Sequence, residues 1–211
     1  QIKKAAKLLE SAKRPVICCG GGVVSAGARD EMIAFAKKTG IPVVATMMGL
    51  GVIPMDNDHY IGMIGSHGKS YANRMMNEAD VIVLCGARVG DRAIPNPKGV
   101  KASIIDPAEI GKNVNAHIPI VGDVKSVLRE FTKEIEACPC DEWLKKVQAA
   151  KKEAPLRGEP RTDFVEPRAF MRDLSAMMED DAILTADVGQ NQIWAANNFN
   201  TKEGRFLTSG G

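Results

Sequence analysis

The feature that most constrains the fold is an alternation of short apolar segments with amphipathic ones. The apolar segments are rich in β-branched residues, as buried parallel strands are, and lie at 16–19, 42–46, 81–85, 102–105 and 118–121. Between and around them, apolar residues recur at helical spacing over residues 2–13, 27–38, 69–78 and 123–136. This alternation predicts an α/β fold, a doubly wound parallel sheet with helices on both faces.

The alternation is interrupted once, which predicts the domain boundaries. Residues 138–166 are charged and contain several prolines, so we expect an interdomain linker there, with one short helix possible around Trp143–Val147. A helix over 167–178, a strand over 182–186 and the loop 187–191 then begin a second α/β pattern. The sequence therefore predicts a dinucleotide-binding domain over 1–137 and the incomplete start of a second α/β domain over 167–211.

Bulk properties exclude several classes of partner. With 28 basic and 26 acidic residues, the net charge of +2 is too small for a nucleic-acid or anionic-membrane surface. Neither a signal peptide nor an apolar run of about 18 residues occurs, so we expect a cytoplasmic protein. The helical start and the closing Ser209-Gly210-Gly211 indicate an expressed fragment.

The five cysteines do not suggest a disulfide framework. Cys18, Cys19 and Cys85 lie in apolar runs and are expected to be buried as small hydrophobic residues. Cys138 and Cys140 lack a second cysteine pair or a nearby histidine, which makes a metal site less favoured than a solvated linker.

In doubly wound sheets, ligands bind beyond the carboxyl ends of the strands. Gly20, Gly21 and Gly22 follow the first strand, and glycines there let backbone N–H groups approach a phosphate. Ser25 replaces the third glycine of a GxGxxG motif, and Thr46 replaces the acidic residue that binds an NAD ribose. A standard NAD site is therefore disfavoured, and a simple tight turn remains an equal alternative.

Two further loops combine glycine with soft apolar side chains. Thr46-Met47-Met48 begins one, and the other contains Ser66-His67 between glycines. Such loops suit a flat heteroaromatic ring, although core-filling methionines are an equal alternative. His67 alone is more typical of a hydrogen-bonded structural residue than of a catalyst.

The next strand ends in Gly86 and two arginines. Arg88 and Arg92 suit bidentate contact with a diphosphate or a carboxylate, and Asp91 can orient a neighbouring arginine; surface ion pairing is the alternative. Asp106 stands at a strand end where a carboxylate can accept hydrogen bonds from a ribose. Asp123 also stands at a strand end and can accept such hydrogen bonds, but it is an equally good helix N-cap.

Taken in order, these segments resemble the central and early C-terminal parts of catalytic subunits of the acetolactate (acetohydroxyacid) synthase family of thiamine-diphosphate enzymes. The resemblance rests on RPVICCGGGV, IPVVATMMGLG, GMIGSHG, GARVGDR, IDPAEIGKN, IPIVGD, ILTADVGQNQIWAA and RFLTSGG. Their order and spacing cover nearly the whole chain apart from the predicted linker.

The resemblance implies site residues. FAD would be held by Gly20, Gly21, Gly22, Thr46, Met47, Met48, Ser66, His67, Gly86, Arg88, Asp106 and Asp123. Asp91 and Arg92 would line the substrate channel, with Arg92 at the 2-oxoacid carboxylate. Gly189, Gln190 and Asn191 match the loop that touches the thiamine diphosphate phosphates, although the family usually has His at position 191.

The resemblance also implies what the full enzyme does. Two 2-oxoacids, pyruvate with pyruvate or with 2-oxobutanoate, are joined with release of CO₂ in branched-chain amino-acid biosynthesis, and the flavin takes no net redox part. The family enzyme uses Mg²⁺ and is expected to be a homo-oligomer, in some cases with a regulatory subunit. The glutamate that activates the cofactor and the metal-binding motif have no match here, so we expect this chain alone to be inactive.

Two other interpretations remain open. One is a sister thiamine enzyme, such as glyoxylate carboligase, sulfoacetaldehyde acetyltransferase or oxalyl-CoA decarboxylase; GARVGDR departs from the commoner GARFDDR at Val89 and Gly90. The other is a non-catalytic nucleotide-binding module.

Overall fold

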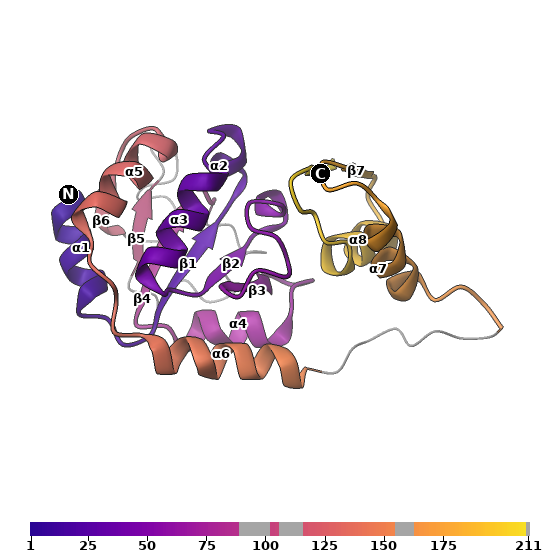
Figure 1. Ribbon diagram of the computed structural model, residues 1–211, viewed down its shortest axis with the longest axis horizontal. Helices are drawn as coiled ribbons and strands as arrows, with labels where there is room; N and C mark the ends of the chain where they lie inside the picture. The colour runs from indigo at the N-terminus through magenta and orange to yellow at the C-terminus, as the bar shows by residue number, and fades with distance from the viewer. Residues whose placement is uncertain (89–101, 106–115, 155–162, 210–211) are drawn as a thin grey trace.

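A computed structural model describes residues 1–88, 102–105, 116–154 and 163–209 (Figure 1). Its main feature is a six-stranded sheet in the order β3-β2-β1-β4-β5-β6, with every neighbouring pair parallel. The strands are β1 (Pro15–Cys19), β2 (Val43–Ala45), β3 (Tyr60–Met63), β4 (Val81–Cys85), β5 (Ala102–Ile105) and β6 (Ala116–Ile120). This confirms the predicted doubly wound α/β fold, with the strand order typical of dinucleotide-binding domains.

Helices cover both faces of this sheet. One face carries α1 (Ile2–Glu10), α3 (Arg29–Thr39) and α5 (Val124–Glu134), and α5 packs against both of the others. The other carries α4 (Ser70–Glu78) and α6 (Asp141–Glu153), which contact each other (Figure 1). Strands β1 and β4 are buried at every position, because parallel strands between two helical layers meet no solvent.

The packing between α3 and α5 shows how the apolar stripes are used. Phe35 and Phe131 are fully buried, and their ring centroids lie 5.0 Å apart in a tilted arrangement. Such aromatic pairs add to the stability gained from burial alone. The helical periodicity that predicted these two segments therefore marks their contact faces correctly.

The segment after α5 differs from the prediction. Cys138 and Cys140 are buried, so the expected solvated segment at 138–140 is wrong. Helix α6 packs on the six-stranded sheet: Trp143 is buried and its Nε1–H donates to Pro15 O at 3.0 Å. Lys151 donates to two backbone oxygens, those of Met55 and Tyr60. We therefore refer to residues 1–154 as the first unit; the exact domain division remains a prediction.

Three short elements of the first unit were not predicted. Residues 60–63 form the edge strand β3, although the sequence indicated a loop from Gly62 onward. The glycine run does not lead directly into the long helix: a five-residue helix α2 (Gly21–Ser25) comes between β1 and α3. A short 3₁₀ helix η1 (Met47–Gly49) follows β2.

Residues 163–209, which we call the second unit, form a smaller α/β arrangement. It contains α7 (Pro167–Met177), β7 (Ile183–Ala186), α8 (Gln190–Asn198) and β8 (Arg205–Thr208). Strands β7 and β8 pair in parallel, and α7 packs against α8. No helix in the described ranges is long and apolar enough to cross a membrane.

Candidate functional site at the carboxyl edge of the sheet

The loops after β1 and β4 meet at the centre of the carboxyl edge. Gly20 N donates to Cys85 O at 3.0 Å, and Gly22 N donates to Gly86 O at 2.9 Å. A Cβ added at Gly20 would lie 2.4 Å from Gly86 O, and one added at Gly22 would lie 2.7 Å from Gly86 Cα. Glycine is required here because two backbones touch, at the point where the strand order reverses.

This contact changes the expected role of the glycines. The N–H groups of Gly20 and Gly22 already bond to protein carbonyls, which leaves them poorly placed to bind a phosphate directly. The short α2 ends at Ser25, and Gly27, which has φ of +57°, follows it before α3 begins. A long helix does not start at the glycine run, so a helix-dipole phosphate site of the usual kind is not formed there.

The loop after β2 lies beside the glycine run. Thr46 N donates to Cys19 O at 2.9 Å, which places η1 next to α2. A Cβ added at Gly21 would lie 3.2 Å from Met48 Cβ. Met48 is 46 % exposed and Met47 is half-buried, so an apolar surface adjoins the bare backbone of Gly21.

The loop after β3 is held firmly while its side chains face solvent. Asn73 on α4 accepts from Gly65 N and donates to Gly65 O, both at 2.9 Å. Gly68 N donates to Gly65 O, which closes the turn. Ser66 and His67 are exposed, so a rigid loop presents two polar side chains beyond the strand end.

Arg88 after β4 is also exposed. It is the last described residue before position 102. Asp91, Arg92 and Asp106, which the sequence predicts to bind substrate and FAD, lie outside the described residues.

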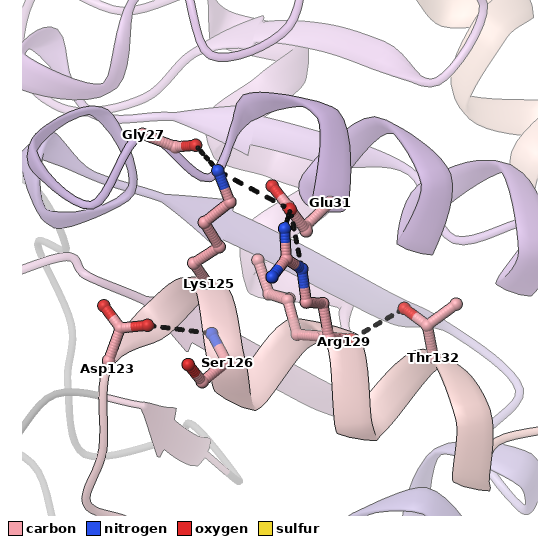
Figure 2. A network of polar contacts seen from close by, with 8 residues as sticks. Gly27, Glu31, Asp123, Lys125, Ser126, Arg129 and Thr132 are labelled. Carbon is pink, nitrogen blue, oxygen red and sulfur yellow. Dashed lines mark hydrogen bonds and ion pairs between the residues drawn. The ribbon is translucent and has the colours of Figure 1, made fainter.

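Asp123 occupies the N-cap of α5 (Figure 2). Its Oδ1 accepts from Ser126 N at 2.9 Å, and this hydrogen bond is the main cause that lowers the pKa of the Asp123 carboxyl. In the first two turns of α5, Lys125 donates to Gly27 O at 3.0 Å and Arg129 pairs with Glu31 on α3 at 2.7 Å (Figure 2). The cap role of Asp123 is present, and these contacts hold the start of α5 against the turn between α2 and α3.

The three cysteines under this edge are structural. Cys18, Cys19 and Cys85 are buried as predicted, and Cys19 and Cys85 are register partners on β1 and β4. Burial raises the pKa of the Cys19 thiol to about 12. A thiol in such surroundings is a poor nucleophile at neutral pH.

The predicted thiamine diphosphate loop, 187–191, lies in the second unit, where its last two residues, Gln190 and Asn191, form the start of α8 instead of a loop. Gly189 is the N-cap of α8 and has φ of +144°, and Gly189, Gln190 and Asn191 are all exposed. Asn191 Nδ2 donates to Asp187 O at 3.2 Å, so this amide stabilises the turn itself. The start of a nine-residue helix with a bare backbone is compatible with a phosphate ligand.

A charged cleft of about 540 Å³ is lined by none of the loops described above. Residues of both units line it: Arg29, Asp30, Ile33, Pro54, Asp56, Asp180, Lys202 and Glu203. Burial lowers the pKa of Arg29, and Lys202 pairs with Asp180. None of the predicted cofactor residues belongs to this cleft, so its size alone does not make it the candidate site.

Sequence reasoning missed the residues that brace the site. Asn73 holds the loop after β3 from within the first unit, and Asn197 on α8 donates to His67 O at 2.9 Å from the second. Neither belongs to a recognisable motif. Their roles depend on contacts between elements, which no local pattern records.

The strand order and the glycine-lined carboxyl edge define a doubly wound domain with the architecture that dinucleotide-binding proteins share. Comparison with known proteins is more specific. Residues 2–131 match the family described as thiamine pyrophosphate enzyme, central domain, and the chain belongs to this family.

Similarity to acetolactate synthases extends over the whole chain. The chain is 42% identical to a probable acetolactate synthase large subunit of Methanocaldococcus jannaschii. It is 36% identical to the large subunit of Lactococcus lactis and 37% identical to the isozyme 1 large subunit of Escherichia coli. Each comparison covers 100% of this chain but 38% of the relative, so the chain spans under two fifths of their length. These matches favour the acetolactate synthase interpretation over the sister enzymes and the non-catalytic module.

Proposed function

We propose that this chain is the flavin-nucleotide-binding part of an acetolactate synthase large subunit. The observation that carries the proposal is the exposed apolar side chain of Met48, which packs against the backbone of Gly21 at the carboxyl edge. Sequence similarity to acetolactate synthases over the full chain supports it.

The described residues fit a flavin nucleotide in three ways. Gly21 lets Met48 pack directly against its backbone, and the exposed thioether of Met48 provides a polarizable apolar contact for a planar ring. Arg88 is exposed and can pair with a diphosphate, for which a guanidinium is well suited. Thr46, Met47, Ser66 and His67 complete the predicted contacts, while Gly20, Gly22 and Gly86 act by letting the two loops meet.

Asp123 is compatible with a double role. Its Oδ1 takes the cap contact, and the carboxylate is exposed, so its other oxygen can accept a hydrogen bond from a ligand hydroxyl. Asp106 remains a prediction from the family resemblance.

The proposed activity belongs to the full-length protein. It would join two 2-oxoacids with release of CO₂, with Asp91 and Arg92 at the substrate and Gly189, Gln190 and Asn191 at the thiamine diphosphate phosphates. Thiamine diphosphate, anchored by Mg²⁺, would supply the carbanion chemistry of decarboxylation and carbon–carbon bond formation. We place this enzyme in the cytoplasm as a homo-oligomer with a regulatory subunit, in keeping with the name large subunit that its relatives carry.

FAD binding by the purified chain tests the proposal. Equilibrium dialysis with FAD, read by flavin absorbance, should give one bound FAD per chain. Met48→Glu should abolish it, because a carboxylate would be brought against the ring. Met178→Glu is the matched control, since Met178 in the second unit is 44 % exposed against 46 % for Met48. No FAD binding by the unsubstituted chain, or equal loss in both variants, would contradict the proposal.

The reaction is tested separately. A full-length protein that contains this sequence, supplied with pyruvate, FAD, Mg²⁺ and thiamine diphosphate, should form acetolactate, and the 211-residue chain alone should form none. Pyruvate consumption without acetolactate would point to one of the sister enzymes.

A further inference from the structure

Helix α8 of the second unit reaches the loop after β3 of the first. Asn197, in its last turn, donates through Nδ2 to His67 O at 2.9 Å and to Ile193 O at 3.1 Å. Its Oδ1 is buried and has no hydrogen-bond partner among the described residues. A buried amide oxygen left unpaired is costly, so the hydrogen bonds that this side chain contributes are the two that Nδ2 donates.

The contact falls at a sensitive point of the loop. Asn73 clamps Gly65, and Lys69 N donates to Met63 O at 2.8 Å, so both ends of the turn are fixed from within the first unit. His67 lies between these anchors, and its carbonyl is held from α8. Fixing that carbonyl fixes the peptide plane, and with it the direction in which the exposed His67 side chain leaves the backbone.

The other end of α8 begins with Gly189 at its N-cap and with Gln190 and Asn191 in its first turn. A helix of nine residues is about 13 Å long, and it has no proline or glycine that would let it bend. Helix α8 thus connects the loop expected to face the flavin with the loop expected to face the thiamine diphosphate phosphates.

A second asparagine also connects the second unit to the first. Asn200 accepts from Met55 N through Oδ1 at 2.7 Å, and a Cβ added at Gly51 would lie 2.9 Å from Thr201. Both contacts reach the segment that follows η1. The second unit therefore touches the first close to the loops after β2 and β3.

We propose that Asn197 is a positioning residue that sets the flavin-facing loop at Ser66–His67 from the second unit. The ligand named here rests on the proposed function. The contact between Asn197 and His67 does not.

The test compares Asn197→Asp with Asn198→Asp. Aspartate keeps the shape of asparagine but removes the N–H donor and adds a negative charge, and the control adds the same charge. Asn198 is the control because its Nδ2 donates to Trp194 O and its Oδ1 accepts from Arg172, both within the second unit. Asn197→Asp should weaken FAD binding about three- to tenfold, as expected for one lost hydrogen bond. It should also shift the amide ¹H–¹⁵N resonances of Ser66 and His67. Asn198→Asp should change neither.

The two readouts separate the possible failures. If the unsubstituted chain binds no FAD, the proposed function fails, and the resonances still decide whether Asn197 sets the loop. Unshifted Ser66 and His67 resonances in Asn197→Asp would overturn the inference. So would an FAD affinity equal to that of the unsubstituted chain, because the loop contact would then have no consequence for the ligand.

Discussion

Strand β1 of the first unit and strand β7 of the second are both short and apolar, but they are covered very differently. All five residues of β1 are buried, whereas β7 alternates exposed and half-buried positions. Ile183 is 61 % exposed and Leu207 on β8 is 42 % exposed. The first sheet lies between two helical layers, and the described part of the second leaves one face in contact with solvent.

This difference teaches where a stable site can form. A sheet packed on both faces holds its loops in fixed positions, as the contact between Gly22 and Gly86 shows. The second unit has fewer buried apolar side chains and contacts the first through Asn197, Asn200 and Thr201. We therefore expect the first unit to bind its ligand as a preformed surface and the second to open more readily.

The largest expected effect concerns α6, which tests whether the first unit extends past residue 137. Trp143→Ala should destabilise the first unit by about 3–5 kcal/mol, because a buried aromatic ring is lost. Trp143→Phe keeps most of the ring and should cost about 1–3 kcal/mol, since Pro15 O loses its donor. Urea unfolding followed by circular dichroism measures both. A cost under about 0.5 kcal/mol for Trp143→Ala would restore the interpretation of this segment as a linker.

The next effect concerns the closed contact between the loops after β1 and β4. Gly86→Ala should cost about 3 kcal/mol, because Gly86 has φ of +54° and the new Cβ would lie 2.6 Å from Gly22 Cα. Gly27→Ala is the matched control: its φ is +57° and nothing lies within 4 Å, so it should cost about 1 kcal/mol. Shifts of the urea midpoint give the two values. Equal costs would mean that backbone conformation alone, and not the contact between the loops, explains the glycine.

A smaller effect should distinguish the two faces of the second sheet. Phe206→Ala removes a buried side chain and should destabilise the second unit by about 2 kcal/mol. Leu207→Ala lies on the exposed face and should cost less than about 0.5 kcal/mol. Tryptophan fluorescence of a Trp143→Phe background, which leaves Trp194 as the reporter, follows the second unit alone. A large cost for Leu207→Ala would show that the apparently open face is covered in solution.

The smallest effect is pH-dependent. The pKa of Asp123 is lowered in the folded chain by its hydrogen bond from Ser126 N, so this stabilisation is complete above the pKa of a free aspartate, about 4. It is lost as the pH falls through the lower folded value. Asn is an equally good cap that does not titrate, so Asp123→Asn should lose less stability than the unsubstituted chain between about pH 5 and pH 2. Parallel pH profiles of the two urea midpoints would exclude the cap as a source of acid sensitivity.

Local sequence patterns predicted well the part of the fold in which helices cover both faces of the sheet. Strands β4 and β5 have the predicted bounds, and for β4 the reason is an unbroken apolar run between polar segments, which has few other solutions. Strand β3 was missed because Tyr60–Met63 is only four residues long and contains Gly62. The length of helix α6 was underestimated because most of its residues are polar or charged and only two of them, Trp143 and Val147, are buried.

The sequence predicted which loops form the candidate site, but not how these loops contact one another. The sequence indicated glycines for a phosphate, whereas Gly20 and Gly22 are needed because Gly86, more than sixty residues away, touches them. The same holds for Asn197, whose partner His67 is 130 residues distant in the chain. Contacts of this range leave no periodic or motif-like signal in one sequence.

Amide hydrogen exchange with and without FAD tests the central claim most directly, because it locates the ligand and compares the two units at once. In the free chain, the β1 and β4 amides should exchange more slowly than those of β7 and β8. Added FAD should slow exchange at Gly21, at Thr46–Met48 and at Ser66–His67, and leave β7 and β8 unchanged. Protection that appears only in the second unit, or no protection at the carboxyl edge of the six-stranded sheet, would contradict the account.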